Sequence, residues 1–202
     1  MNHEKIVQDF IKNQTEGWAE EDFPAMEQAL LENRDRILDS LTSALRTVCS
    51  KANELQAAGE KGPAAVIGIS FLRTNIMDNI WRHRVDLYDE RGFRDPVECC
   101  AGYTLDFVWQ YLWKRLDKVA VAAGTGLYRN KVRPVHLEWV KQRMAEEYNV
   151  AATVITKAAI RDAIRIPEYK ALKKAPDLKI IMGEYGDAGL LLYAEQPGQE
   201  PA

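Results

Sequence analysis

The spacing of apolar residues changes from helical to strand-like near Pro63, and this change divides the chain. Before Pro63, apolar side chains recur at intervals of three, four or seven residues, as they do on one face of a helix. A short helix is expected first. A longer, continuous helix is predicted from Asp22, with Pro24 in its first turn, to about Ala58, where a glycine-rich segment ends it.

Beyond Pro63, residues 64–90 alternate between apolar and polar positions, which predicts a β-hairpin connected around residues 75–79. One face of its second strand is expected to point into the core, through Trp81, His83, Val85 and Leu87. The other face is expected to point into solvent, through Arg82, Arg84, Asp86 and Tyr88. This alternation is typical of an antiparallel sheet that is buried on one side only.

Helical spacing returns over residues 96–165, where one helix is predicted from about Pro96 to Ala122 and another from Pro134 to Ile164. The second would be about 45 Å long, so we expect one end to overhang the core or to meet a second subunit. Residues 178–194 favour a C-terminal strand that joins the hairpin, with 188–194 left open as a strand or a helical turn, and residues 195–202 are expected to be frayed.

These elements predict an α+β fold in which long helices pack on a small antiparallel β-sheet. We expect one domain over residues 1–202, with a helical segment 1–60, the hairpin 64–90, the helices 96–165 and the strand 178–194.

Aromatic residues gather on the helix predicted over 96–122. Tyr103, Phe107 and Tyr111 form one stripe, and Trp109 and Trp113 lie across the helix from them. Such a surface suits a shared core, a subunit interface or a ligand pocket, and the sequence leaves all three open.

Charge is divided unevenly along the 202 residues, although the net charge is only −3. Residues 1–60 carry 6 basic and 12 acidic groups, whereas residues 114–174 carry 14 basic and 6 acidic groups. The asymmetry favours attraction within the molecule or across a dimer. Nucleic-acid binding through the basic segment 157–174 is a second alternative that the sequence disfavours, because no nucleic-acid module is recognisable.

Chemical motifs are sparse. The three cysteines, Cys49, Cys99 and Cys100, match no disulfide or metal spacing and are interpreted as buried thiols. The histidines lie in no metal-binding pattern, so we expect no metal, no cofactor and no assignable catalytic residue. The glycine-rich stretch GEYGDAG, residues 183–189, is interpreted as a turn rather than a phosphate loop. The N-terminus does not look like a secretory signal and no apolar run could span a bilayer, which favours a cytoplasmic protein without a membrane partner.

Three segments carry a resemblance: FLRT at 71–74, VDLYDERGF at 85–93 and LKIIMGEYGD at 178–187. They resemble a bacterial family of uncharacterised proteins in which an LRT strand leads into an LYDE strand. The resemblance covers about a fifth of the chain and implies a shared α+β fold, with no assigned activity.

We therefore expect a binding or regulatory module, as a homodimer, that holds a small molecule or a protein partner near the aromatic helix and the polar hairpin face. The residues expected to contact the ligand are Arg73, Arg84, Asp86, Tyr88, Tyr111 and Glu184. The alternative is an enzyme that uses Asp86 or Glu184 as an acid or base in the same cleft.

Overall fold

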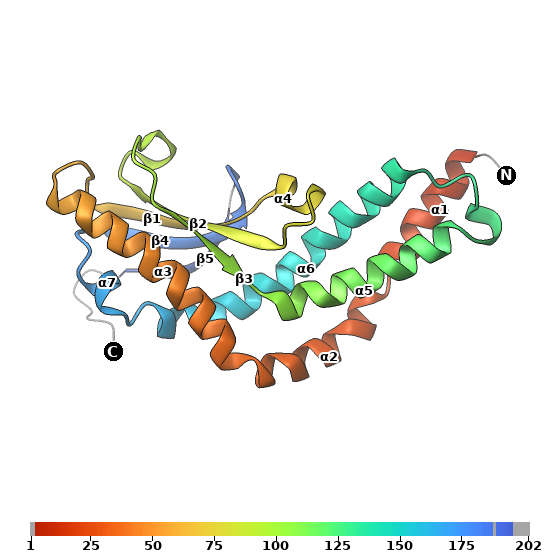
Figure 1. The fold of residues 1–202 in the computed structure, drawn as a ribbon, viewed down its shortest axis with the longest axis horizontal. Helices are drawn as coiled ribbons and strands as arrows, with labels where there is room; N and C mark the ends of the chain where they lie inside the picture. Colours follow the sequence, from red (N-terminus) through yellow and green to blue (C-terminus); the bar gives the residue numbers. More distant parts are fainter. Residues whose placement is uncertain (1–2, 188, 196–202) are drawn as a thin grey trace.

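The computed structural model describes residues 3–187 and 189–195, which form a five-stranded sheet with helices packed against it (Figure 1). The helices are α1 (His3–Thr15), α2 (Trp18–Glu32), α3 (Arg34–Ala57), α4 (Arg73–Met77), α5 (Asp106–Ala123), α6 (Pro134–Ala163) and α7 (Pro167–Lys170), with 3-10 turns η1 (Gly92–Arg94) and η2 (Gly126–Tyr128). The strands are β1 (Ala64–Phe71), β2 (Arg82–Asp89), β3 (Cys100–Thr104), β4 (Lys174–Glu184) and β5 (Gly189–Ala194). The predicted α+β class is confirmed.

The strands lie in the order β3-β2-β1-β4-β5, so β1 is central. The predicted hairpin is the antiparallel pair β1 and β2, and β3 and β5 extend the sheet by further antiparallel pairs. The C-terminal strand joins the hairpin as expected, but β4 runs parallel to β1. Residues 189–194 form a strand and not a helical turn.

The tail was expected to fray from residue 195. Glu195 instead accepts a hydrogen bond from Nζ of Lys174 at 2.8 Å, because β5 ends beside the start of β4. The rest of the predicted frayed segment, residues 196–202, lies outside the described residues.

One face of the sheet packs on the long helices. On β2 this face carries His83, whose ring lies 5.6 Å from that of Trp109 on α5. On β3 it carries Tyr103, whose hydroxyl is 3.1 Å from that of Thr156 on α6. The predicted two faces of β2 are thus correct. We call the opposite face, which carries Arg84, the outer face.

The predicted continuous helix from Asp22 to Ala58 is wrong, because two helices meet at Asn33. The Asn33 side chain donates to the carbonyl of Ala29 at 2.7 Å, and its backbone leaves the helical region at φ −107° and ψ 10°. Asparagine competes in this way with helical hydrogen bonds. The helix start is also corrected, since α2 begins at Trp18 and contains Pro24, while Asp22 pairs with Arg115 of α5 at 3.1 Å.

The predicted helix over 96–122 is wrong in its first third. Residues 100–104 form strand β3 beside β2, and helix α5 begins only at Asp106. Tyr103 therefore does not continue the stripe of Phe107 and Tyr111 along one helix, as the four-residue spacing suggested. Only one residue, Leu105, separates the strand from the helix.

Helix α6 confirms the predicted helix from Pro134 and is 30 residues long. Its first half extends beyond the sheet together with α5 and α1, as Figure 1 shows on the right, so the expected overhang is present. This helical arm is held partly by Phe10 of α1, whose ring packs 4.9 Å from that of Tyr128 in η2. No helix within the described residues is both long and apolar enough to cross a membrane.

A buried amide joins α3 to the start of the sheet. Gln56, which is 5 % exposed, donates to the carbonyls of Gly62 at 3.0 Å and Lys173 at 2.8 Å. It also accepts a hydrogen bond from the amide of Lys173 at 2.9 Å. One side chain thus fixes the segments that lead into β1 and β4, the two central strands.

Replacing Gln56 by alanine is expected to lower the free energy of unfolding by about 2 kcal/mol, because buried backbone groups lose their partner. Gln28→Ala is a matched control, since Gln28 is exposed and its amide donates to the exposed Glu32 side chain at 3.0 Å. That variant is expected to change stability by less than about 0.5 kcal/mol. Urea unfolding followed by circular dichroism measures both, and equal effects would contradict this role of Gln56.

His83 is fully buried, with Nε2 at 2.7 Å from Oδ1 of Asn149 on α6. Burial lowers the pKa of His83 to about 4, because the charged imidazole is poorly solvated there. The unfolded chain takes up this proton near pH 6.5, whereas the folded chain takes it up only near pH 4.

Stability should therefore fall by about 3 kcal/mol as the pH drops from 6.5 to 4 on account of His83 alone. In His83→Gln, which keeps a polar group beside Asn149, this part of the pH dependence should disappear. His3→Gln changes an exposed histidine and should keep it. The test is to measure the free energy of unfolding at several pH values between 4 and 6.5. If it falls as steeply with pH in His83→Gln as in the wild type, His83 is not the group responsible.

Candidate functional site

The structure does not gather the six predicted ligand contacts into one cleft. Arg84, Asp86 and Tyr88 lie together on the outer face of β2. Tyr111 lies on α5, on the other side of the sheet, and its hydroxyl donates to the carbonyl of Ala25 in α2 at 3.1 Å. The aromatic helix and the polar hairpin face therefore belong to different surfaces of the molecule.

Arg73 and Glu184 meet at the end of the central strands, where Nε of Arg73 donates to Oε1 of Glu184 at 2.5 Å. Glu146 of α6 lies 2.7 Å from the same guanidinium. All three side chains are between one third and one half exposed. They tie α4 and α6 to the sheet at its surface.

Strand register brings small residues into a row across the outer face. Arg84 pairs with Ser70 of β1, Ser70 with Gly183 of β4, and Gly183 with Gly189 of β5. Gly68 of β1 stands in the neighbouring row, opposite Asp86. Three of these positions have no side chain, so the strand backbone on this face is covered only by neighbouring groups, such as the Tyr88 ring beside the buried Gly68.

A hollow of about 150 Å³ opens above this backbone. Its lining comes from β1, β2, β4, β5, the turn between β4 and β5, and the segment containing η1. It consists of Val66, Gly68, Ile69, Ser70, Tyr88, Gly92, Phe93, Ile181, Gly183, Glu184, Gly186, Asp187 and Gly189. Two of the predicted contacts, Tyr88 and Glu184, are among these residues. The stretch 183–189, interpreted as a turn, indeed connects two strands, and its glycines also shape the hollow.

Aromatic rings stand around the hollow. The ring of Phe93 lies 5.2 Å from that of Tyr88 and 6.1 Å from that of Tyr185, both in edge-to-face arrangements. The guanidinium of Arg84 lies 5.9 Å from the centre of the Tyr185 ring. Burial raises the pKa of Tyr88, and Asp86 and a hydrogen bond with Tyr185 raise it further, so its hydroxyl stays protonated.

Asp86 corrects the prediction of a fully solvated face. It points to the outer side of β2 as expected, but its side chain is only 3 % exposed because Arg84 lies over it. Nε of Arg84 donates to both carboxylate oxygens, at 2.9 and 2.8 Å, and Nη2 donates to Oδ1 at 2.8 Å. Glu98, which is 65 % exposed, also accepts a hydrogen bond from Nη2 of Arg84. Two acidic groups thus share one cation.

Cys100 corrects the reading of all three cysteines as buried, since it is exposed on β3 while Cys49 and Cys99 are buried. Burial still raises the pKa of the Cys100 thiol, and Glu98 and Asp86 raise it further against the opposing effect of Arg84.

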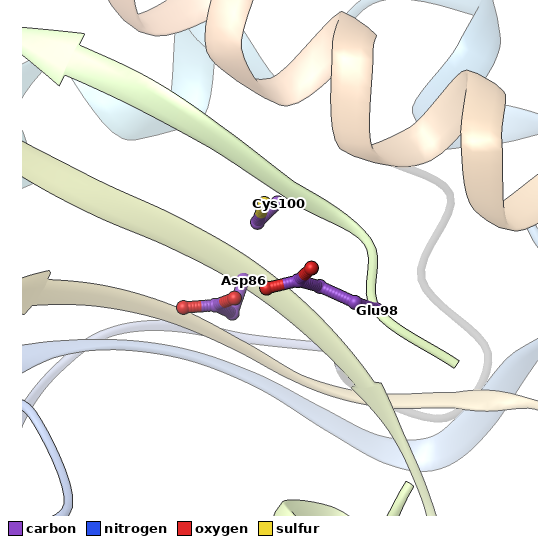
Figure 2. A group of neighbouring side chains, drawn as sticks. All are labelled: Asp86, Glu98 and Cys100. Carbon is purple, nitrogen blue, oxygen red and sulfur yellow. The ribbon is translucent and has the colours of Figure 1, made fainter. Parts of the chain in front are cut away.

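Figure 2 shows Asp86, Glu98 and Cys100 side by side, and their potential ligand atoms lie within 4.8 Å of one another. A metal ion placed there would have to displace the guanidinium of Arg84, which already neutralises the carboxylates.

A buried ion pair anchors the segment that supplies Phe93 and Glu98. The side chains of Lys61 and Asp95 are 0 % and 1 % exposed and contact each other directly. Asp95 also accepts hydrogen bonds from the backbone amides of Asp89 and Val97, each at 3.1 Å. Burial acts to raise the pKa of Asp95, but Lys61 and these amides outweigh it, so the pKa is lowered. The segment after β2 is thereby fixed beside the outer face.

Most cations of the basic segment 157–174 are exposed, including Lys170 and Lys173, and two of its members lie close to acidic side chains. Lys157, Arg161 and Arg165 are exposed near the end of α6, and Arg165 lies 3.4 Å from Asp162. Lys174 is directed toward Glu195 and stands 4.0 Å from the centre of the Tyr169 ring.

Sequence reasoning missed most of the lining of the hollow, including Phe93, Gly183 and Gly189. The signal available was a glycine near the end of one apolar strand and another at the start of the next, since isolated glycines in strands often mark close approach of another group. Comparisons with known proteins add nothing to this site, because no family model, curated protein or solved structure matches the chain. The suggested family resemblance stays a prediction.

The Arg84 and Asp86 pair can be tested by a double-mutant cycle. Arg84→Met should destabilise the fold by about 3 kcal/mol, because it leaves a buried carboxylate without its counter-charge. Adding Asp86→Asn should recover much of this loss, since the neutral amide costs less to bury. Glu98→Gln is the control and should have a much smaller effect than Arg84→Met, because Glu98 is exposed. Additive effects of the two substitutions, measured by urea unfolding, would contradict the coupling.

Proposed function

We propose that the protein is a binding module that holds a small planar ligand in the hollow on its outer face. The observation that carries the proposal is the cross-strand row of Ser70, Gly183 and Gly189 beside Arg84. Side chains on a sheet normally prevent a ligand from reaching the backbone. Here their absence leaves a flat floor for a ring to lie on.

The size and lining of the hollow support a ligand with a single ring. An apolar cavity of about 150 Å³ is known to accommodate a benzene-sized molecule. Tyr88 and Phe93 offer ring faces and edges for aromatic contacts, which favour stacked or edge-to-face partners. Binding sites of this kind combine apolar walls with a few polar groups that fix the orientation of the ligand.

Arg84 and Tyr185 supply the polar end of the site. The Arg84 guanidinium is directed by Asp86 and Glu98 and lies near the Tyr185 ring. A polar substituent on the ligand, such as a carbonyl or a carboxylate, would find a donor there. The ligand class is therefore an aromatic or heteroaromatic ring that carries one hydrogen-bond acceptor.

Binding is better supported than acid–base catalysis. Asp86 and Glu184, the two carboxylates considered as acid or base, are each held by an arginine through two or more hydrogen bonds. A general base needs a free lone pair within reach of its substrate. The proposal includes a regulatory role and a cytoplasmic location for this module.

Amide resonances of Gly68, Gly183 and Gly189 report directly on the floor of the hollow. We expect a titration with benzoate and nicotinamide, at up to millimolar concentration, to shift these three resonances with at least one compound. Ser70→Leu and Gly183→Leu fill the hollow and should abolish the shifts.

Arg82→Leu is the matched control, because Arg82 lies on the same face of β2 but outside the lining of the hollow. It should leave the shifts unchanged. The proposed function would be wrong if the ligand-induced chemical-shift changes persisted in both Ser70→Leu and Gly183→Leu. It would also be wrong if no compound changed the amide chemical shifts of the three glycines.

A further inference from the structure

Another hollow, of about 240 Å³, lies where the start of α3 meets the junction between β3 and α5. One wall is a stripe of α3 from Asn33 to Ser40, and the other is formed by residues 104–107. Oγ of Ser40 donates to the carbonyl of Thr104 at 3.1 Å, which fixes the two walls to each other. We call this site the junction hollow. It shares no lining residue with the hollow on the outer face, so it is a separate place for a ligand.

The buried part of this lining is apolar. Ile37 of α3 is 4 % exposed, and Leu105 and Phe107 are 1 % and 8 % exposed. An apolar cavity of about 150 Å³ holds a benzene-sized molecule, so the junction hollow has room for a branched aliphatic group together with a polar head. Ligand sites commonly combine such apolar walls with a few polar groups.

The exposed part of the lining carries charges of both signs, on Arg36, Asp39 and Asp106. Arg36 and Asp39 stand three residues apart on α3, a spacing at which opposite charges can pair. Nη1 of Arg36 instead donates to Oδ1 of Asn33 at 3.1 Å. Within residues 3–187 and 189–195, none of these three charged groups takes part in an ion pair. One cation and two carboxylates are therefore left available around one apolar cavity.

We propose that the junction hollow binds a zwitterion with an apolar side chain, of the class of the free α-amino acids. The guanidinium of Arg36 receives the carboxylate, because arginine can donate two parallel hydrogen bonds to it. Asp39 and Asp106 receive the ammonium group, which has three N–H donors to share between them. The aliphatic side chain of the ligand lies against the buried apolar lining.

The mixture of charges selects a zwitterion over a ligand with a single charge. A simple anion would pair with Arg36 but would also approach two carboxylates. A simple cation would pair with the carboxylates but would approach the guanidinium. Each of these ligands gains one attraction and meets a repulsion, whereas a zwitterion satisfies both signs at once.

Three compounds of matched shape test the ligand class. L-leucine, at up to millimolar concentration, should shift the amide resonances of Ile37, Ser40 and Phe107. 3-Methylbutylamine is leucine without its carboxylate, and 4-methylpentanoate is leucine without its ammonium group. Each should bind at least about tenfold more weakly, because it loses its charge-assisted hydrogen bonds on one side. No shifts with leucine, or equal affinity for all three compounds, would overturn the proposal.

Substitution of the charged residues tests their assignment. Arg36→Met and Asp106→Asn should each weaken leucine binding about tenfold. Arg34→Met and Asp35→Asn are the matched controls, since both residues are exposed in the first turn of α3 but lie outside the lining. They should leave the affinity unchanged. Unchanged amide resonances far from the junction hollow will show that each variant is folded. Equal losses in the controls, or no loss in Arg36→Met and Asp106→Asn, would contradict the proposed contacts.

Discussion

The parallel pairing of β1 with β4 is the constraint on which the other features depend. It places β1 at the centre of the sheet, with hydrogen bonds on both sides, and it aligns Ser70 with Gly183. The same register decides which side chains share the outer face with Arg84. A shift of one residue would turn every side chain of β4 to the opposite face, replacing the glycine floor with Met182.

Different interactions organise the two faces of the sheet: apolar packing on the inner face and ion pairs on the outer face. The inner face is apolar and packs on α3, α5 and α6, with a neutral His83 among aromatic rings. The outer face is organised by ion pairs, in which Arg84 covers Asp86 and Lys61 holds Asp95. These pairs position side chains more than they stabilise the fold, because desolvation offsets most of the attraction between buried charges. A site built this way has fixed polar groups beside an apolar floor.

The spacing of apolar residues correctly predicted features that depend on neighbouring residues in the sequence. Alternation along β2 assigned its two faces correctly, and helical spacing located α6 from Pro134 onward. Long-range pairing was beyond such patterns. Tyr103 fits both a helical stripe and a strand, and only its place opposite His83 on β2 decides for the strand. For the candidate site, three outward residues of β2 were anticipated, but the glycine floor depends on strand register and the burial of Asp86 depends on where Arg84 folds.

Strand order also governs how the chain can be made. The central strand ends at Phe71, whereas its parallel neighbour begins at Lys174, about a hundred residues later. During synthesis, the hairpin emerges from the ribosome long before β4, and its most apolar edge has no partner in the meantime. Completion of the sheet must therefore wait until β4 has been made, which slows folding and makes the loss of β4 destructive.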